Sequence, residues 1–441
     1  MNNVKNILLV GGTVLDPAAK VETVADVLII DGKIAAVGPE ARSQKPEARM
    51  REIDCTGCYV TPGLMDIHVH FREPGQEVKE TVATGSRAAV AGGFTTVCCM
   101  PNTTPTLDND TQIDFIYAQA REVGGGAGLC NVLPIGAITK GRKGEELAEM
   151  ALMHAAGAAG FSDDGAGVGS AAVMLKALQY IKMIGSMLTQ HCEEPTLSGG
   201  GVMNAGAVAA KLGLTGLPAV AEELMIARDL LLNRRIGARY HVQHISTAGA
   251  VELVRQAKRE GQPVTAEVTP HHLLLTEEAC ATWNGGYDSH MKMNPPLRTK
   301  ADVEACIAGV VDGTIDCLAT DHAPHTREEK ELEFDKAPFG IVGLETALGL
   351  YAKALVEPGH LTWMQLIEKM TVAPARVMNL KGKGTLAVGS AADVTVFDPK
   401  ASWKVNPEKF YSKSRNTPFG GWELKGVVRK TIVGGRVVFG D

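Results

Sequence analysis

The stretch YVTPGLMDIHVHFREPG, residues 59–75, is an apolar strand-like run that ends in two histidines and an arginine. Side chains at positions i and i+2 of a strand lie on the same face, so His68 and His70 are predicted to project together. Neutral imidazole is a good ligand for zinc. The pair therefore favours a metal site, although two hydrogen-bonded core histidines would give the same pattern.

Eight strand-like segments run through the middle of the chain, separated by helix-compatible segments. The predicted strands cover residues 59–69, 94–100, 129–138, 158–162, 186–191, 239–245, 263–269 and 314–319. The predicted helices include residues 78–91, 112–122, 144–156, 171–184, 219–233, 248–260 and 342–355. This alternation is typical of a parallel α/β structure, either a (β/α)8 TIM-like barrel or an open doubly wound sheet.

Polar residues at the strand ends favour the barrel. His191 and His244 end two further predicted strands, Asp321 follows a third, and the adjacent Asp163 and Asp164 follow a fourth. In a barrel the carboxyl ends of all strands meet at one face, where active sites are built. The sequence therefore predicts a metal site at that face.

The two ends of the chain differ from the middle, because they contain short alternating strands with glycine-rich turns. Neither end has enough strands for a core of its own, so we expect the two to join. The predicted organisation is a small β-sandwich domain made of residues 1–57 and 376–441, next to a barrel of residues 58–375.

The composition, with 45% hydrophobic and 21% charged residues, is that of a soluble globular protein. A formal net charge of −6 argues against a nucleic-acid or anionic-membrane partner. No apolar run is long enough to span a bilayer. Nine scattered cysteines favour a reducing compartment, so we expect a cytoplasmic protein.

Several segments resemble the amidohydrolase superfamily. FREPG (71–75) after the histidine pair is similar to the type I dihydroorotases, as are MPNT (100–103), GFSDDG (160–165), NPPLR (294–298), TDHAPH (320–325) and PFG (338–340). Their order and spacing extend over nearly the whole chain. The resemblance implies a reversible, zinc-dependent cyclisation of N-carbamoyl-L-aspartate to L-dihydroorotate plus water, a step of pyrimidine biosynthesis.

The resemblance also implies a metal centre with one or two zinc ions and six ligands: His68, His70, Asp164, His191, His244 and Asp321. The first histidine pair and Asp321 would hold one ion, and the two later histidines the other. Asp164 would bridge them, where many relatives have a carboxylated lysine. Local sequence does not separate Asp164 from Asp163 in this role. Zinc suits these ligands, and manganese or cobalt are alternatives.

Substrate contacts follow from the residues and from the resemblance together. Arg72 lies two residues beyond His70, and its guanidinium can form paired hydrogen bonds with a carboxylate. Asp321 would carry the proton between water and the leaving nitrogen. The resemblance adds further substrate-binding residues: His70, Asn102, Asn294, His325, Phe339 and Gly340.

Two other functions stay open at this point. One is a different cyclic amidase, such as an allantoinase or dihydropyrimidinase, which normally carries the bridging lysine. The other is a non-catalytic dihydroorotase-like scaffold for aspartate transcarbamoylase, which typically lacks metal ligands that this chain has. A homodimer is expected, and association with aspartate transcarbamoylase is compatible with activity.

Other polar groups are interpreted as structural. Five further histidines are expected to be packing residues or neighbours of the site: His154, His241, His271, His272 and His322. Two Glu-Glu pairs, residues 193–194 and 222–223, could be a second carboxylate pair for acid/base chemistry, and solvated helix and loop faces explain them as well. The charged run of residues 327–333 is expected to be a solvated loop, with part of a lid over the substrate as the alternative.

Overall fold

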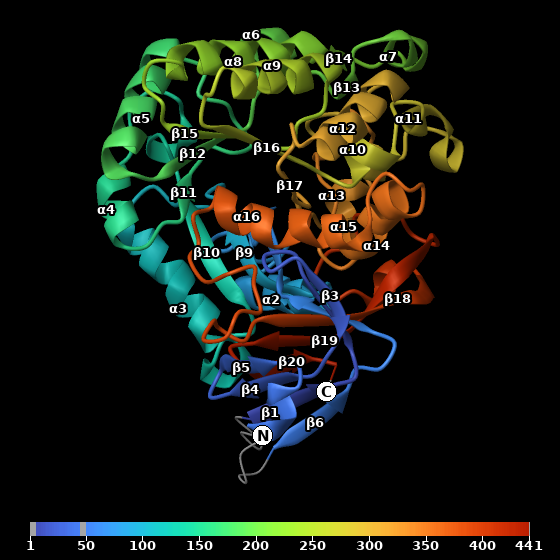
Figure 1. Cartoon of the computed structure of the whole chain (residues 1–441). Helices are drawn as coiled ribbons and strands as arrows, with labels where there is room; N and C mark the ends of the chain where they lie inside the picture. The colour runs from blue at the N-terminus through green and yellow to red at the C-terminus, as the bar shows by residue number, and fades with distance from the viewer. Residues whose placement is uncertain (1–5, 45–49, 441) are drawn as a thin grey trace.

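Figure 1 shows the computed structural model, which describes residues 6–44 and 50–440. Its centre is a sheet of eight parallel strands: β17 (Cys317–Leu318), β16 (Val264–Val268), β15 (Arg239–Val242), β12 (Met187–Gln190), β11 (Gly160–Phe161), β10 (Asn131–Gly136), β9 (Phe94–Cys99) and β8 (Leu64–Val69). A parallel bridge between Val69 and His322 joins β8 to the segment after β17 and closes the ring. The predicted (β/α)8 TIM-like barrel is confirmed.

Helices cover the outside of this barrel (Figure 1): α2 (Val82–Ala91), α3 (Asp110–Gly126), α4 (Met150–Ala155), α5 (Ala171–Ile184), α8 (Ala219–Asn233), α9 (Ala248–Arg259), α12 (Lys300–Asp312) and α14 (Ala347–Tyr351). Strands β8, β9 and β12 are buried at every position. Such continuous burial arises because helices cover the outer face of the sheet and strand side chains fill the inside of the barrel.

The predicted strand of residues 59–69 is two strands that meet at Gly63. The first, β7 (Tyr59–Pro62), pairs with strands from both chain ends, and only β8 belongs to the barrel. A Cβ atom at Gly63 would lie 2.1 Å from Thr95 Oγ1, so the close approach at this crossing requires glycine.

Helix boundaries differ from the prediction at several points. The helix α12 lies outside the predicted segments, and the helix predicted for residues 342–355 begins only at Ala347 and continues as a π-helix, η4 (Ala352–Val356). Residues 144–156 are helical only in α4. The helix α2 begins at Val82 because Thr81 caps it and exchanges two hydrogen bonds with Thr84.

Strands from the two chain ends lie side by side at one end of the molecule, blue and red in Figure 1. One sheet has the order β20–β19–β18–β7–β2–β3, with β2 (Thr13–Asp16), β3 (Val21–Val24), β18 (Val394–Lys404), β19 (Glu423–Val433) and β20 (Arg436–Phe439). The other has the order β5–β4–β1–β6, with β1 (Asn6–Val10), β4 (Val27–Ile30), β5 (Lys33–Val37) and β6 (Arg51–Asp54).

Buried apolar side chains from both of these sheets form one cluster. The domain boundaries after residues 57 and 375 stay a prediction. Residues 1–5, 45–49 and 441, which belong to the predicted small domain, lie outside the described part of the chain. Within residues 6–44 and 50–440, no helix combines the length and the apolar character needed to cross a membrane.

Short elements complete the chain between and after these units: α1 (Glu40–Ser43), α6 (Pro195–Ser198), β13 (Met203–Asn204), α7 (Ala207–Leu212), β14 (Gly216–Leu217), α10 (His271–Leu274), α11 (Ala279–Thr282), α13 (Arg327–Lys330), α15 (Trp363–Met370) and α16 (Val372–Val377). Of these, α10 and α13 directly follow barrel strands or their extensions and therefore lie beside the carboxyl ends of the strands.

Candidate metal and substrate site

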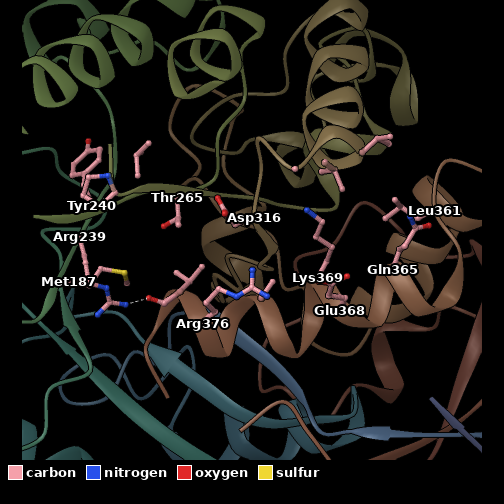
Figure 2. Close-up of a pocket in the computed structure, with 17 residues that line it drawn as sticks. Met187, Arg239, Tyr240, Thr265, Asp316, Leu361, Gln365, Glu368, Lys369 and Arg376 are labelled. Carbon is pink, nitrogen blue, oxygen red and sulfur yellow. Dashed lines mark hydrogen bonds between the residues drawn. The ribbon is translucent and has the colours of Figure 1, made fainter. Parts of the chain in front are cut away.

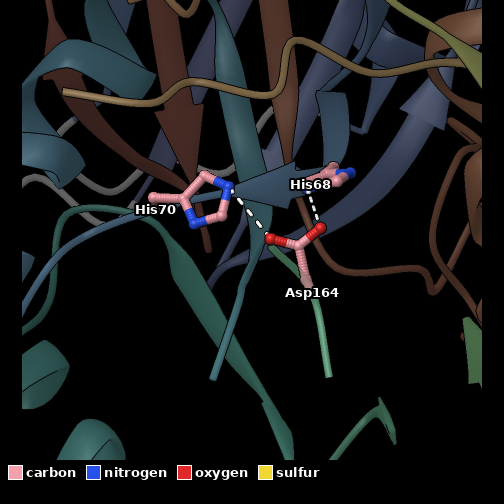
Figure 3. A group of neighbouring side chains, drawn as sticks. All are labelled: His68, His70 and Asp164. Atoms are coloured by element: carbon pink, nitrogen blue, oxygen red, sulfur yellow. Dashed lines mark ion pairs between the residues drawn. The ribbon is translucent and has the colours of Figure 1, made fainter. Parts of the chain in front are cut away.

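The predicted metal ligands meet at the carboxyl ends of the barrel strands. All six are buried, and they come from the ends of β8, β11, β12, β15 and β17. His68 Nε2 lies 3.2 Å from Asp164 Oδ1, and His70 Nε2 lies 3.4 Å from Asp164 Oδ2 (Figure 3). His70 Nε2 also lies 2.9 Å from Asp321 Oδ1. Residues that are far apart in the sequence thus form one cluster.

The spacing of these atoms fits a divalent cation. Two ligands of one tetrahedral zinc, at bond lengths of about 2.0–2.1 Å, lie roughly 3.3 Å apart. His191 Nδ1 lies 2.9 Å from His244 Nε2 and 3.9 Å from Asp164 Oδ1. His68 Nε2 and Asp164 Oδ1 are buried without a hydrogen-bond partner among the described residues. Buried polar atoms are nearly always satisfied, so a cation that they would bind explains both.

The adjacent acids Asp163 and Asp164 point in different directions. Asp163 Oδ1 accepts hydrogen bonds from the backbone N–H groups of Ile138, at 2.8 Å, and Thr139, at 3.0 Å. Its second oxygen accepts from the Thr139 hydroxyl. The carboxylate of Asp164 faces the histidines, and Arg142 donates to its backbone carbonyl. The geometry therefore selects Asp164 as the candidate ligand, which local sequence alone leaves open.

A buried glutamate that the sequence reasoning missed orients His68. Glu267, on β16, has an oxygen 2.6 Å from His68 Nδ1 and a second oxygen 3.1 Å from His241 Nε2. Burial raises the pKa of Glu267, but the nearby His68 and the hydrogen bonds from His241 and His68 outweigh burial and bring the pKa to about 2. The carboxylate therefore holds the proton of His68 on Nδ1 and turns Nε2 toward Asp164. In the sequence, the signal for this role is a single acidic residue, Glu267, within the mostly apolar predicted strand of residues 263–269.

Glu193 connects a candidate ligand with the substrate side of the site. Its Oε2 lies 3.1 Å from His191 Nε2 and accepts a 2.6 Å hydrogen bond from Asn294 Nδ2. Burial raises the pKa of Glu193, yet the hydrogen bonds from His191 and Asn294 and the charge of His191 lower it to about 2. The prediction of a solvated pair at 193–194 is wrong for Glu193, because tertiary folding brings His191 and Asn294 together around it.

A cavity of about 270 Å³ opens beside the cluster. Five of the six candidate ligands line it, and so do the other predicted substrate-binding residues: Arg72, Asn102, Asn294, His325, Phe339 and Gly340. Asn102 accepts from His70 Nδ1 at 2.8 Å and donates to Asp164 Oδ2 at 3.4 Å, which places it between the cavity and the candidate ligands.

Arg72 brings a positive charge to the wall of this cavity. It is 8% exposed, its Nε donates to the Pro324 carbonyl at 3.2 Å, and none of the described carboxylates forms an ion pair with it. Burial lowers the pKa of Arg72 to about 10, although the negative charges of Asp321 and Asp164 act to raise it. The guanidinium therefore stays charged at neutral pH. A buried cation without a paired carboxylate favours an anionic ligand.

His325 and Gly340 form one closely packed wall. His325 Nε2 donates to the Phe339 carbonyl at 2.7 Å, and burial lowers the pKa of His325 to about 4, so the ring is neutral. Gly340 has a φ of 150°, and a Cβ atom there would lie 2.6 Å from the Ala323 carbonyl oxygen and 2.8 Å from His325 Cδ2. Only glycine therefore permits this contact.

Asp321 is ionised in the cluster. Burial raises its pKa, but the nearby His68 and the hydrogen bond and charge of His70 outweigh burial and hold the pKa well below its usual value. The backbone of Asp321 has a φ of 48°, and Arg72 and His244 also have positive φ values, 60° and 31°. In residues other than glycine, each such conformation costs on the order of 1–3 kcal/mol, and these conformations cluster at functional sites.

The remaining predicted residues lie near the site or away from it. His271, His272 and His322 are buried, with His272 Nε2 donating to the Pro295 carbonyl at 2.9 Å and His322 Nε2 lying 3.4 Å from Glu80 Oε2. His154 is exposed on α4. His241, predicted to be structural, is buried and acts through Glu267 on His68.

Two further predictions of solvated charges are wrong. Glu222 is 3% exposed, because its carboxylate accepts from the backbone of Ser246 at 2.8 Å and pairs with Arg298 at 3.5 Å. Within the charged run of residues 327–333, Lys330 is also 3% exposed. Sequence alone gives no sign of either burial, because both depend on segments distant along the chain.

A second cavity, of about 420 Å³, lies where the barrel strands begin (Figure 2). Arg239, Thr265, Asp316, Lys369 and Arg376 contribute to its lining. Lys369 donates to the Ile315 carbonyl at 2.7 Å. None of the candidate metal ligands lines this cavity, and barrel enzymes build their active sites at the opposite end.

Comparison with known proteins identifies the family. The chain is 54% identical over 435 residues to a dihydroorotase from Pelotomaculum thermopropionicum, covering 99% of both sequences. It is 51% identical to a dihydroorotase from Anaeromyxobacter sp., covering 98% of this chain and 97% of that one. The chain belongs to the dihydroorotase family. Like other members it is a metal-dependent cyclic amide hydrolase of the amidohydrolase superfamily.

Family models and solved structures agree with this membership. A model described as dihydro-orotase-like matches residues 57–250, and an amidohydrolase family model matches residues 338–439. An L-hydantoinase (dihydropyrimidinase) from Arthrobacter aurescens superimposes with a TM-score of 0.85 at 29% identity, covering 98% of this chain and 95% of that one. A D-hydantoinase (dihydropyrimidinase) from Thermus sp. gives 0.82 at 27% identity, covering 98% and 94%. The dihydroorotase family thus shares its fold with these hydantoinases.

Proposed function

We propose that this dihydroorotase family member interconverts N-carbamoyl-L-aspartate and L-dihydroorotate plus water, as a step of pyrimidine biosynthesis. The observation that carries the proposal is the position of Arg72 on the wall of the cavity that Asp321 also lines, where the described residues give this buried cation no carboxylate partner. L-Dihydroorotate combines a cyclic amide with a carboxylate. A single cavity thus offers one group for each part of the substrate.

The residues divide the chemistry among them. A bound divalent metal would lower the pKa of water and polarise the amide carbonyl. The six clustered side chains fit zinc, and we infer that His68, His70 and Asp321 would hold one ion, that His191 and His244 would hold a second, and that Asp164 would serve both. Metal content per chain, measured on protein purified without added metal, tests both the identity and the number.

Asp321 carries the proton. In the hydrolytic direction its carboxylate accepts a proton as the oxygen of water adds to the ring carbonyl carbon, and it returns that proton to the ring nitrogen as the C–N bond breaks. The low pKa of Asp321 ensures that it begins as a base. Burial and the nearby Arg72 lower the pKa of His70, which favours the neutral imidazole that a metal ion would bind.

The substrate carboxylate is placed against Arg72. Asn102, held by His70, and His325, held by the Phe339 carbonyl, border the same cavity, and Arg72 supplies the positive charge of its lining. Asn294 donates to Glu193, which also contacts the candidate ligand His191, and it lines the same cavity, where it would contact the ring. A cytoplasmic homodimer, able to associate with aspartate transcarbamoylase, remains a prediction that light scattering and co-purification would test.

A second candidate is a cyclic amidase for neutral rings, favoured by the likeness to solved hydantoinases. Steady-state hydrolysis of L-dihydroorotate, dihydrouracil and hydantoin by the purified protein separates the two. We expect turnover of dihydroorotate, abolished by a strong chelator and restored by zinc. A preference for either neutral ring would favour the second candidate.

The variant Arg72→Met sharpens this assay. Loss of a charged hydrogen bond is worth about 1.5–3 kcal/mol, so KM for dihydroorotate should rise roughly 10- to 150-fold. Hydrolysis of a neutral ring, where detectable, should keep its KM, because it makes no such bond. An unchanged KM for dihydroorotate would remove Arg72 from the binding site.

A further inference from the structure

Lys330 is a buried cation that the mechanism above does not use. It ends the short helix α13, directly after the segment that carries Asp321 and His325, and it is 3% exposed. Its Nζ donates to the Pro338 carbonyl at 2.9 Å and to the Gly340 carbonyl at 3.3 Å. No carboxylate of the described residues forms an ion pair with it. A buried amine that contacts only carbonyl oxygens loses its hydration without gaining a paired charge, which costs free energy. The burial of Lys330 therefore indicates a role for these two contacts.

The two acceptors flank a wall of the substrate cavity. Pro338, Phe339 and Gly340 line that cavity, whereas Lys330 does not. Each of the three carbonyl groups accepts from a side chain outside the segment: Pro338 from Lys330, Phe339 from His325, and Gly340 from Lys330 and from Asn416 at 3.0 Å. Because their partner Lys330 lies outside the cavity, the Pro338 and Gly340 carbonyls turn away from it. The wall therefore presents no extra negative oxygen to an anionic substrate.

We propose that Lys330 is a positioning residue for the substrate, which rests on the function proposed above. By binding the carbonyls on either side of Phe339 it holds this wall against His325 and keeps two carbonyl oxygens out of the carboxylate subsite. Lys330 and His325 belong to one chain segment, and the helix between them is capped by Thr326 and Glu329. His325 and the cavity wall are thus joined through one capped helical turn.

The amine acts as a hydrogen-bond donor rather than as a charge. Burial and the nearby Lys292 lower the pKa of Lys330 to about 7, against the opposing charges of Asp288 and Glu329. Both the ammonium and the neutral amine carry enough N–H groups for two carbonyl acceptors. Positioning is therefore retained on both sides of neutral pH, and a neutral donor is expected to replace Lys330 in part.

The wall is also held from a second side. Gly340 N–H donates to the Lys292 carbonyl at 3.0 Å, and the Lys292 ammonium lies 4.7 Å from the centre of the Phe339 ring. These contacts remain when Lys330 is replaced, so the segment should stay folded but lose the orientation of its carbonyl groups. This predicts a defect in substrate binding, not in metal binding or in chemistry.

Steady-state kinetics of Lys330→Met and Lys330→Gln in the full metal-loaded chain test the proposal. For Lys330→Met we expect KM for dihydroorotate to rise about tenfold while kcat stays within about threefold, the pattern of lost binding rather than lost chemistry. Lys330→Gln, which keeps an N–H donor, should give an intermediate KM and also serves if the methionine variant does not fold. Lys336→Met is the matched control, because it removes an exposed lysine of the same segment, paired with Glu333 at 3.3 Å; its KM should not change.

Three outcomes would overturn the proposal. One is a wild-type KM in folded Lys330→Met or Lys330→Gln, and another is a loss of kcat at unchanged KM. The third is an equal rise of KM in Lys336→Met, which would indicate a general effect of charge. Wild-type protein without dihydroorotate turnover would refute the proposed function itself, and with it this proposal, before any variant is compared.

Discussion

Replacing Glu267 by glutamine should weaken metal binding without unfolding the barrel. The carboxylate accepts from His68 at 2.6 Å and from His241 at 3.1 Å, so two ring N–H groups share its two oxygens. Glutamine has one oxygen and one NH2 group. The NH2 group would therefore lie opposite the N–H of one of the two imidazole rings, where two donors meet without an acceptor. If the oxygen remains on His241, the N–H of His68 loses its acceptor in a fully buried position.

The size of the effect follows from this count. A buried polar group left without a partner costs about 1–3 kcal/mol, which corresponds to roughly 5- to 150-fold in an equilibrium constant. Residues that orient metal-binding histidines typically contribute 10- to 100-fold in affinity. We therefore expect the dissociation constant for zinc to rise about 10- to 100-fold in Glu267→Gln.

Competition with a chromophoric chelator, starting from metal-free protein, measures this constant directly. Asp229→Asn is a suitable control, since it removes another buried carboxylate, bonded to Tyr240 at 2.9 Å and paired with Arg228 at 2.7 Å, that contacts none of the candidate ligands. Thermal unfolding confirms that both variants are folded. A zinc affinity within about twofold of wild type in folded Glu267→Gln would refute the role assigned to Glu267.

Two further variants address catalysis and stability. Asp321→Asn should retain metal but lose roughly 10²- to 10⁴-fold in kcat, the usual contribution of a general base, and near wild-type turnover would exclude that role. Burial raises the pKa of Glu345 to about 7 against hydrogen bonds from Ser412 and Tyr411, so its contribution to stability is complete below its unfolded pKa of 4.5 and is lost as the pH rises toward 7. Urea unfolding of wild type and Glu345→Gln should therefore show wild type losing up to roughly 3 kcal/mol relative to the variant between pH 4.5 and 8, and parallel curves would contradict the shift.

Periodicity and strand-end chemistry were sufficient to predict the architecture and the convergence of the candidate ligands at one face. The spacing of His68 and His70 placed both side chains on one face, and His191, His244 and Asp321 each ended a predicted strand. In a closed parallel barrel these positions must converge, because every strand ends at the same face. Local patterns predicted the ends of strands less well. Residues 59–69 form one continuous apolar run, so the sequence does not show that the chain passes from one sheet to another at Gly63.

The tertiary structure decided everything that depends on a partner distant in the sequence. Asp163 and Asp164 have the same chemistry, and only the position of the Thr139 backbone draws Asp163 away from the histidines. Glu267, Glu193 and Lys330 read as ordinary charged residues until folding brings His68, Asn294 and Gly340 to them. The sequence determines which strand a group ends and which face it takes, because these follow from the backbone repeat. Which acceptor satisfies a buried donor is set only by long-range packing, where the cost of an unpaired polar group selects the partner.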